Sequence, residues 1–207
     1  MKHGPRHYPL LAGSLLLFGS SLLGCALTSK AEALSPRYFS PQAERATRSA
    51  KAPMAYELRL GSVTSASHLD DRIAYRIGRS EMGFYEDQRW TENPESYLRR
   101  ALERDLFEER GLSRIVTGTA PILEVEITAF EELRGSPARA RVVLTFMLRD
   151  ERRSLGGRTL ELERPVTQQA GSDAAERLAG TLSETLEAAV RELGDEVVAK
   201  LAAPPAP

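Results

Sequence analysis

Apolar residues at every second position constrain the fold of this chain more than any other feature. They run from Leu123 to Ala129 and again from Ala140 to Leu148, which is the spacing of half-buried strands. The turn residues Gly135-Ser136-Pro137 separate the two runs. Gly156-Gly157 lies within a second turn, and a third run extends from Leu160 to Val166. The sequence therefore predicts a three-strand meander in this half.

The preceding segment repeats the strand pattern with weaker signals. Tyr56 to Leu60 and Ile73 to Ile77 alternate apolar with polar residues, and the residues between them, Gly61 to Asp71, are mostly small or polar. We expect two strands joined by a loop. Gly78-Arg79-Ser80 is a turn sequence, and Met82 to Gln88 is predicted to be the hairpin partner of the second strand.

Two segments have helical periodicity. Asn93 and Pro94 are typical of an N-cap and a first helical position, and Gly111 is expected to end that helix. The second helix should run from Asp173 to Pro204-Pro205. Its apolar stripe is Leu178, Leu182, Leu186, Ala189, Val190, Leu193, Val197 and Leu201. Such a stripe usually packs on a sheet; the alternatives are a partner helix or a homo-oligomer seam.

The predicted element order is βββαβββα. Strands followed by helices in this order favour an α+β fold, in which a mostly antiparallel sheet of about six strands is covered on one face by two helices.

The N-terminus has the organisation of a secretory signal. A basic head with Lys2 and Arg6 precedes an almost wholly apolar or small run from Leu10 to Cys25. This run is shorter than the roughly 20 apolar residues that a membrane-spanning helix needs. Residues 1–24 are therefore expected to direct export and to take no part in the fold.

The end of this run, Leu22-Leu23-Gly24-Cys25, resembles the lipobox of bacterial lipoproteins. That resemblance implies cleavage between Gly24 and Cys25 and acylation of Cys25 with chains such as palmitate. Several acyl chains on one residue give a firm anchor, whereas one chain alone binds only marginally. Ala26 favours delivery to the outer membrane, facing the periplasm. The alternative is an ordinary signal peptide that ends near a chance cysteine.

Four segments follow from these features. Residues 1–24 are the signal peptide and residues 25–54 the lipidated N-terminus and tether, in which Tyr38-Phe39 could dock as a short edge strand. Residues 55–203 are expected to form one α+β domain, and residues 204–207 a tail.

Composition removes several classes of function. The whole chain has 28 Lys and Arg against 29 Asp and Glu. Cleavage removes Lys2 and Arg6, which leaves a formal charge of −3 and gives no reason to expect a nucleic-acid partner.

His68 is the only histidine after cleavage, and it is expected on the surface. One imidazole supplies neither a catalytic triad nor a zinc site. The acidic pairs Asp70-Asp71, Glu108-Glu109 and Glu131-Glu132 are predicted to be solvated. We expect no catalytic residue, metal or cofactor.

One block carries a more specific resemblance. Residues 69–94, LDDRIAYRIGRSEMGFYEDQRWTENP, contain a Tyr-Arg pair on a strand, an aromatic strand, and Arg-Trp followed by a proline that opens a helix. This pattern resembles the ABC-type transport auxiliary lipoprotein family. The matching residues are Ile73, Tyr75, Arg76, Tyr85, Arg89, Trp90 and Pro94. These positions are interpreted as structural, since a large aromatic between strand and helix usually packs in the core. Cys25 is the only residue to which the resemblance gives a defined role.

The resemblance implies a function. It suggests a non-enzymatic outer-membrane lipoprotein that docks a periplasmic MCE (mammalian cell entry) lipid-transport assembly. The implied partners are an MCE-domain protein, the ABC transporter subunits and a phospholipid. The alternatives are a lipoprotein that supports another envelope-assembly machine, such as lipopolysaccharide assembly, and a periplasmic hydrolase.

Overall fold

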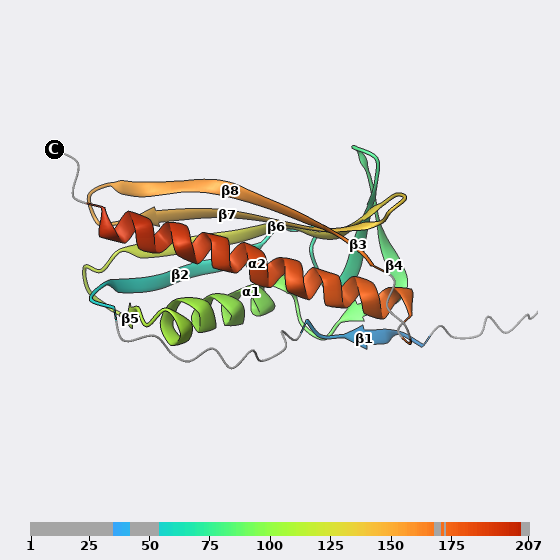
Figure 1. Ribbon diagram of the computed structural model, residues 1–207, viewed down its shortest axis with the longest axis horizontal. Coiled ribbons are helices and arrows are strands. Elements are labelled where there is room, and N and C mark those ends of the chain that lie inside the picture. Colours follow the sequence, from blue (N-terminus) through green and yellow to red (C-terminus); the bar gives the residue numbers. More distant parts are fainter. Residues whose placement is uncertain (1–34, 42–53, 168–170, 172, 204–207) are drawn as a thin grey trace, which may run out of the picture. The chain divides into compact units, whose positions relative to one another are not determined.

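The computed structural model describes residues 35–41, 54–167, 171 and 173–203 (Figure 1). The chain divides into two units, Met1–Leu34 and Ser35–Pro207, and every described residue belongs to the second. Gly24, Cys25 and the predicted cleavage site lie outside the described residues, as does Pro204-Pro205.

The second unit combines one mixed sheet with helices. Its elements are β1 (Arg37–Phe39), β2 (Glu57–Ser65), β3 (Arg72–Ile77), β4 (Glu81–Trp90), α1 (Pro94–Glu103), η1 (Arg104–Glu109), β5 (Ser113–Arg114), β6 (Ile122–Arg134), β7 (Arg139–Arg149), β8 (Ser154–Pro165) and α2 (Ala174–Ala202). The predicted order of six long strands and two helices is confirmed. The structure adds the short strands β1 and β5, and η1 continues α1 as a single π-helical segment.

Strand β6 organises the sheet. Its first half pairs in parallel with β2, and its second half pairs in parallel with β3, on either side of a register shift between Ile127 and Ala129. Strand β7 pairs antiparallel along almost the whole of β6, and β8 pairs antiparallel with β7. The β3–β4 hairpin is also antiparallel. The longest ladders are therefore antiparallel, as predicted, while β1, β2 and β5 contribute parallel pairs.

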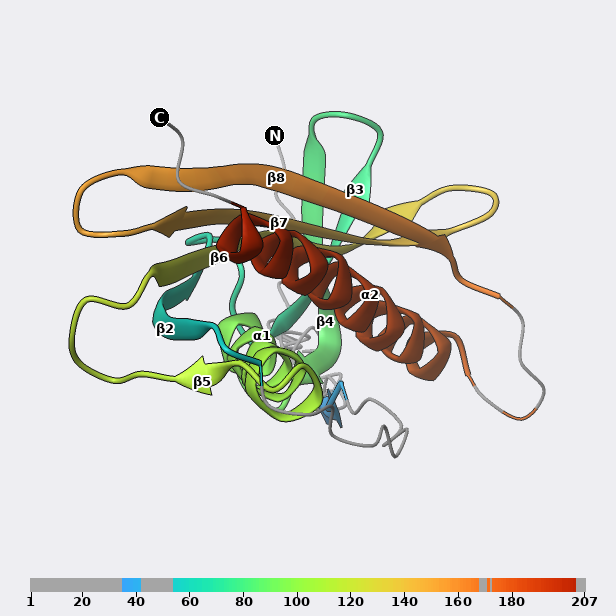
Figure 2. The same ribbon diagram turned by 60° about the vertical axis from the view of Figure 1, so that its left-hand side comes forward.

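Both helices cover the same face of the sheet (Figures 1 and 2). Helix α2 begins where the sequence predicts, because the Asp173 side chain accepts a hydrogen bond from the backbone N–H of Glu176. Its apolar stripe packs mainly on β7 and β8, and Leu182, Ala189 and Leu193 are fully buried. This burial confirms that the stripe faces the sheet.

An ion-pair group fastens the end of η1 to α2. Arg110 donates from Nε to Asp105 Oδ2 over 2.6 Å and from Nη1 to Asp195 Oδ1 over 2.6 Å. Gly194 leaves the space for these side chains, since a Cβ there would collide with both Asp105 and Arg110. The predicted helix end is also confirmed, because Gly111 follows with a positive φ of 75°.

The predicted loop from Gly61 to Asp71 is partly wrong. Strand β2 continues to Ser65 through a register shift between Leu60 and Val63. Gly61 permits a close approach of β6, since a Cβ there would lie 2.8 Å from Ile122 Cγ2. A bulge adds one residue to a strand and so shifts the alternation of apolar and polar residues by one position. The alternation in the sequence is therefore interrupted at Gly61, although the strand itself continues.

The predicted edge strand at Tyr38-Phe39 is confirmed. Strand β1 pairs in parallel with the end of β4, with Arg37 opposite Gln88 and Phe39 opposite Trp90. Part of the segment predicted as tether is therefore fixed to the sheet. Among the described residues, none of the helices has the length and apolar character to span a membrane.

Candidate functional site

The residues of the predicted family motif form two groups, one at each end of β4. Trp90 and Pro94 lie where β4 passes into α1, and we call the packing around them the Trp90 junction. Tyr75, Arg76 and Tyr85 lie on the β3–β4 hairpin, beside the second half of β6. Together with four neighbours they form what we call the arginine–tyrosine cluster, whose two parts lie on opposite faces of the sheet because consecutive residues of a strand alternate between its faces. Its members are Tyr75, Arg76, Tyr85, Glu131, Glu132, Arg134 and Arg141.

The Trp90 junction is an apolar wedge between sheet and helix. The Trp90 side chain is 1% exposed, and its ring lies 4.9 Å from the Phe130 ring and 6.2 Å from the Tyr97 ring, centroid to centroid. The Tyr97 hydroxyl accepts a hydrogen bond from the backbone N–H of Glu92 over 3.0 Å. This geometry supports the interpretation of Trp90 as a core residue.

Helix α1 begins at Pro94, as the sequence predicts, with Pro94 in the first turn. Asn93 occupies the N-cap position with extended backbone, but its side chain makes no capping hydrogen bond. The Asn93 amide instead points to Glu95 Oε1 at 3.4 Å. The helix start therefore depends on Pro94 and on the buried apolar side chains that follow it, rather than on the cap.

The arginine–tyrosine cluster contains a carboxylate with no exposure to solvent. Glu131 is 0% exposed. Arg76 donates to it from Nε over 2.8 Å and from Nη2 over 3.1 Å, and Arg141 Nη1 lies 3.4 Å away. Arg141 Nε also lies 2.8 Å from Glu161 Oε1, although without the alignment of a hydrogen bond. A buried charge costs free energy unless it is paired, and here two arginines pair with one glutamate.

The prediction that Glu131-Glu132 is solvated surface is therefore wrong. Strand β6 does not end near Ala129 but continues to Arg134, between β3 on one side and β7 on the other. This position places Glu131 in the middle of a sheet, beside Ala74 of β3. The glutamate is buried by its neighbours in space, which its neighbours in sequence do not reveal.

The second part of the cluster is aromatic. The rings of Tyr75 and Tyr85 meet edge to face at 5.3 Å, and the Arg134 guanidinium lies 3.3 Å from the Tyr75 ring centroid. The Tyr85 hydroxyl donates to Glu132 Oε2. Burial, together with this hydrogen bond, raises the pKa of Tyr85 above its ordinary value of 10.0.

Arg89 joins the two groups through the backbone. Its Nη1 donates to the carbonyl of Tyr85 over 2.9 Å, and its Nε lies 3.8 Å from Asp71 Oδ2. The motif residues thus hold the hairpin, β6 and the start of α1 in one arrangement. Sequence reasoning missed Glu131, Arg134 and Arg141; the only available signal was the apolar Leu133 just before the turn at Gly135, which extends the strand pattern.

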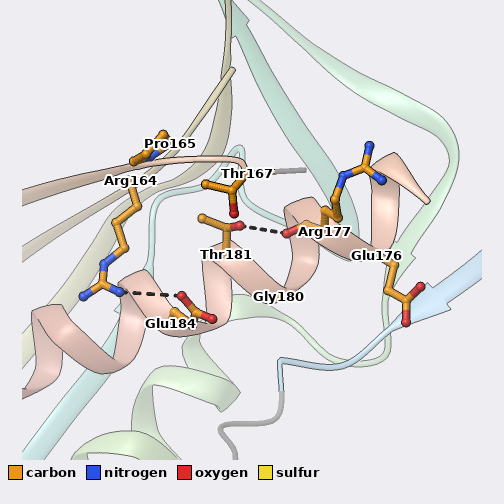
Figure 3. Close-up of a pocket in the computed structure, with 8 residues that line it drawn as sticks. All are labelled: Arg164, Pro165, Thr167, Glu176, Arg177, Gly180, Thr181 and Glu184. Carbon is orange, nitrogen blue, oxygen red and sulfur yellow. Dashed lines mark hydrogen bonds and ion pairs between the residues drawn. The ribbon is translucent and has the colours of Figure 1, made fainter. Parts of the chain in front are cut away.

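A pocket of about 380 Å³ lies between the end of β8 and the first half of α2 (Figure 3). Arg164 reaches across it to Glu184, with 3.6 Å between Nη1 and Oε2. The Thr181 hydroxyl donates to the carbonyl of Arg177 within the same helix. The remaining lining residues are Pro165, Thr167, Glu176 and Gly180. None of the residues predicted from the sequence lies here, and the opposite charges in the lining balance one another.

The remaining candidate groups do not form a reactive site. His68 lies in the turn between β2 and β3, half-buried rather than on the surface, and its Nε2 has no hydrogen-bond partner among the described residues. In the part of the chain that the structure describes, no three His, Cys, Asp or Glu side chains come together as a metal site would require. Asp70 is half-exposed and its carboxylate accepts from Arg72.

Comparison with known proteins gives a family and a fold. The model of the ABC-type transport auxiliary lipoprotein component matches residues 39–194, which confirms the resemblance found in the sequence. Protein XCC0632 from Xanthomonas campestris is similar at 22% identity over 79% of this chain and 95% of its own, with a TM-score of 0.66. The hypothetical protein CT253 from Chlamydia trachomatis is similar at 12% identity over 72% of this chain and 100% of its own, with a TM-score of 0.52. No curated protein matches.

Proposed function

Because this chain belongs to the ABC-type transport auxiliary lipoprotein family, we propose that it is the non-enzymatic auxiliary component of an MCE-type ABC lipid transport system. In this role it docks the periplasmic MCE assembly at the outer membrane. ATP hydrolysis takes place in a separate inner-membrane subunit. The family match over most of the described domain is the observation that carries the proposal.

The proposed anchor is Cys25. The lipobox-like sequence Leu22-Leu23-Gly24-Cys25 precedes the domain, and membership of a lipoprotein family supports the same interpretation. Acyl chains on Cys25 hold the protein at the membrane, because each buried CH₂ contributes about 0.8 kcal/mol and two or more chains bind stably. The mature protein then faces the periplasm from the outer membrane.

A role in docking is consistent with the positions of the motif side chains inside the domain. The side chains of the family motif are tied into the Trp90 junction and the arginine–tyrosine cluster, where each has partners within the domain. Such residues maintain the shape of the domain and leave the contact with a partner to the exposed surface. A phospholipid, an MCE-domain protein and the ABC transporter subunits are the partners that we propose.

Co-purification tests this function. The wild-type protein is extracted from membranes in mild detergent, and the proteins and lipids that accompany it are identified by mass spectrometry. We expect an MCE-domain protein and ABC transporter subunits. Recovery of a lipopolysaccharide-assembly complex instead, with no MCE-domain protein, would overturn the proposal.

Cys25→Ala is the matched variant for the anchor. We expect it to lose the lipid label and to remain uncleaved or become soluble, because no other cysteine is available for acylation. A Cys25→Ala protein that keeps its lipid label in membrane fractions would contradict the assignment of Cys25.

A further inference from the structure

Strand β8 forms a long border of the sheet. It pairs with β7 on one side, and within the described residues no strand pairs with its other side. Figures 1 and 2 show it as the outermost strand of the β6–β7–β8 meander. At 12 residues it is far longer than the other terminal strands, β1 with 3 residues and β5 with 2.

The register identifies the backbone groups on the free side of β8. The backbone N–H of Val166 donates to the carbonyl of Ala138, and the pairing of β7 with β8 runs without a register shift from there to Gly156. In an antiparallel pair every second residue bonds to the partner strand, and the residues between them direct their N–H and C=O groups away from it. The outward-directed residues, which we call the β8 edge, are Gly157, Thr159, Glu161 and Glu163.

The β8 edge is open, whereas side chains meet the other strand borders. On β2, Arg99 donates from Nη2 to the carbonyl of Gly61, and on β4, Arg89 donates from Nη1 to the carbonyl of Tyr85. In the part of the chain that the structure describes, the backbone groups of the β8 edge have no such partner. Sheets usually protect a border with a proline, a bulge or a charged side chain, and the only proline of β8 is Pro165 at its end.

The charged side chains of β8 lie over the two faces of the sheet rather than across its border. Toward α2, Arg158 pairs with Glu192 over 3.0 Å. On the opposite face, Glu161 and Glu163 pair with arginines of β7 over 2.8 and 2.9 Å. These ion pairs hold the side chains over the faces, and the outward backbone groups between them stay accessible.

The side chains beside the β8 edge indicate which kind of segment fits there. A strand added to β8 places alternate side chains on the two faces of the sheet. On one face they lie beside Glu161, whose side chain is 51% exposed, and Glu163. On the other face they lie beside Leu160 and Leu162, which pack on the core. Opposite charges and apolar pairs stabilise neighbouring strands, so the matching segment alternates basic with apolar residues.

A second copy of β8 does not match this pattern. Its residues on the face of Glu161 are again those of the β8 edge, which include two glutamates and no basic residue. Pairing of two copies therefore adds carboxylates at the positions where basic side chains fit.

We propose that the β8 edge binds an extended segment of a partner protein by β-strand addition, with basic residues of that segment beside Glu161 and Glu163. Backbone hydrogen bonds supply the affinity, and the alternate side chains supply the specificity. This inference goes beyond the proposed function, because it depends neither on the kind of transport system nor on the acylation of Cys25.

Peptide binding to the full chain, extracted from membranes in neutral detergent, tests this surface. The probe is a fluorescent peptide with blocked termini that alternates lysine and valine over the length of the β8 edge, and binding is measured by anisotropy. Two further probes carry N-methyl groups, one on the backbone amides of the lysines and one on those of the valines. Since only one of these two sets of amides faces β8, we expect one methylated peptide to lose binding and the other to keep it.

A peptide that alternates glutamate and valine is the control for charge. It should bind at least about tenfold more weakly than the lysine peptide, because several cross-strand pairs change from opposite to like charge.

Amide hydrogen exchange, followed by NMR, locates the bound peptide. In the free protein the amides of the β8 edge should exchange faster than those of Arg158, Leu160 and Leu162, which bond to β7. The lysine peptide should protect the amides of the β8 edge.

Thr159→Pro removes one outward N–H and leaves the ladder to β7 intact, so it should weaken binding about tenfold. Thr159→Val is the matched control, because it keeps the N–H and a β-branched side chain; its affinity should stay within about twofold of the wild type. The methylated peptides test the same contact on the unchanged protein, whether or not Thr159→Pro folds.

Four results would overturn the inference: no binding of the lysine peptide, equal binding of the two methylated peptides, equal binding of the glutamate peptide, or protection at β1 or β4 in place of the β8 edge. A free protein that sediments as a dimer, with the amides of the β8 edge already protected, would also overturn it, since a second copy would then occupy the edge.

Discussion

The Trp90 junction and the arginine–tyrosine cluster lie at opposite ends of β4, yet different forces hold them. Trp90 is buried against Phe130 and Tyr97. The stabilisation from apolar burial depends on the area removed from water and not on the charge state of neighbouring groups. Glu131 is equally buried, but only because Arg76 and Arg141 supply charged partners. One sequence motif thus contributes both to the apolar core, through Trp90, and to a buried ion-pair group, through Arg76.

Truncation of Trp90 should have the largest effect. Trp90→Ala removes a fully buried indole and should lower the free energy of unfolding by about 3–5 kcal/mol. For a domain of this size that corresponds to a decrease in melting temperature of about 6 °C or more. Trp90→Phe is the control and should lose much less. An unchanged melting temperature in Trp90→Ala, with weakened binding to the MCE partner, would instead place Trp90 in a binding site.

Neutralisation of Glu131 tests the ionic region. Glu131→Gln keeps the shape of the side chain but removes the charge that pairs with Arg76 and Arg141, and should cost about 1–3 kcal/mol in urea unfolding. Glu126→Gln is the matched control, because Glu126 is an exposed glutamate on the same strand; it should change stability by less than about 0.5 kcal/mol. Equal effects of the two variants would show that burial of Glu131 has no energetic consequence.

Alkaline pH should separate the two regions. The pKa of Tyr85 is raised in the folded protein by burial and by its hydrogen bond to Glu132. A raised pKa means that stability is fully present below the unfolded value of 10.0 and is lost as pH rises from there through the folded pKa. Tyr85→Phe should therefore be less stable by about 1 kcal/mol at neutral pH and should lose less stability above pH 10 than the wild type.

The Trp90→Phe variant serves as the control for this measurement, since it retains Tyr85. Its unfolding free energy, measured by chemical denaturation across the same pH series, should run parallel to that of the wild type. If Tyr85→Phe shows the same alkaline decrease as the wild type, the hydroxyl of Tyr85 is not responsible for it.

The smallest effect is expected at Arg134. Its guanidinium stacks on Tyr75 at 3.3 Å but is 38% exposed, so Arg134→Ala should cost about 0.5–1 kcal/mol. Arg134→Lys keeps the charge and loses the planar stacking; thermal unfolding should rank it between the wild type and Arg134→Ala. A lysine variant as stable as the wild type would show that charge, rather than stacking, is what Arg134 contributes.

Local sequence patterns were sufficient to predict most of the helices and strands. The meander of β6, β7 and β8, the β3–β4 hairpin and both helices follow from periodicity, the other turn residues and Pro94, all of which act between residues close in sequence. The predicted turn at Gly156-Gly157 is wrong, because both glycines lie within β8 and pair with β7. The position of the apolar stripe on α2 follows in the same way, because a helix that buries one face must present that face to the sheet. Once these elements are predicted, their order along the chain is enough to predict the α+β class.

The tertiary structure alone decided the parallel strand pairings. The sequence contains no local signal that β2 and β3 share one edge of β6 or that β5 pairs with β2, and it predicts the edge strand β1 without identifying its partner β4. The burial of Glu131 depends on those pairings, because only the approach of β3 and β7 on either side of β6 removes its carboxylate from water and supplies Arg76 and Arg141. Burial and ion pairing between residues 55 positions apart are properties of packing, and for that reason the apolar core could be predicted from this sequence while its ionic counterpart could not.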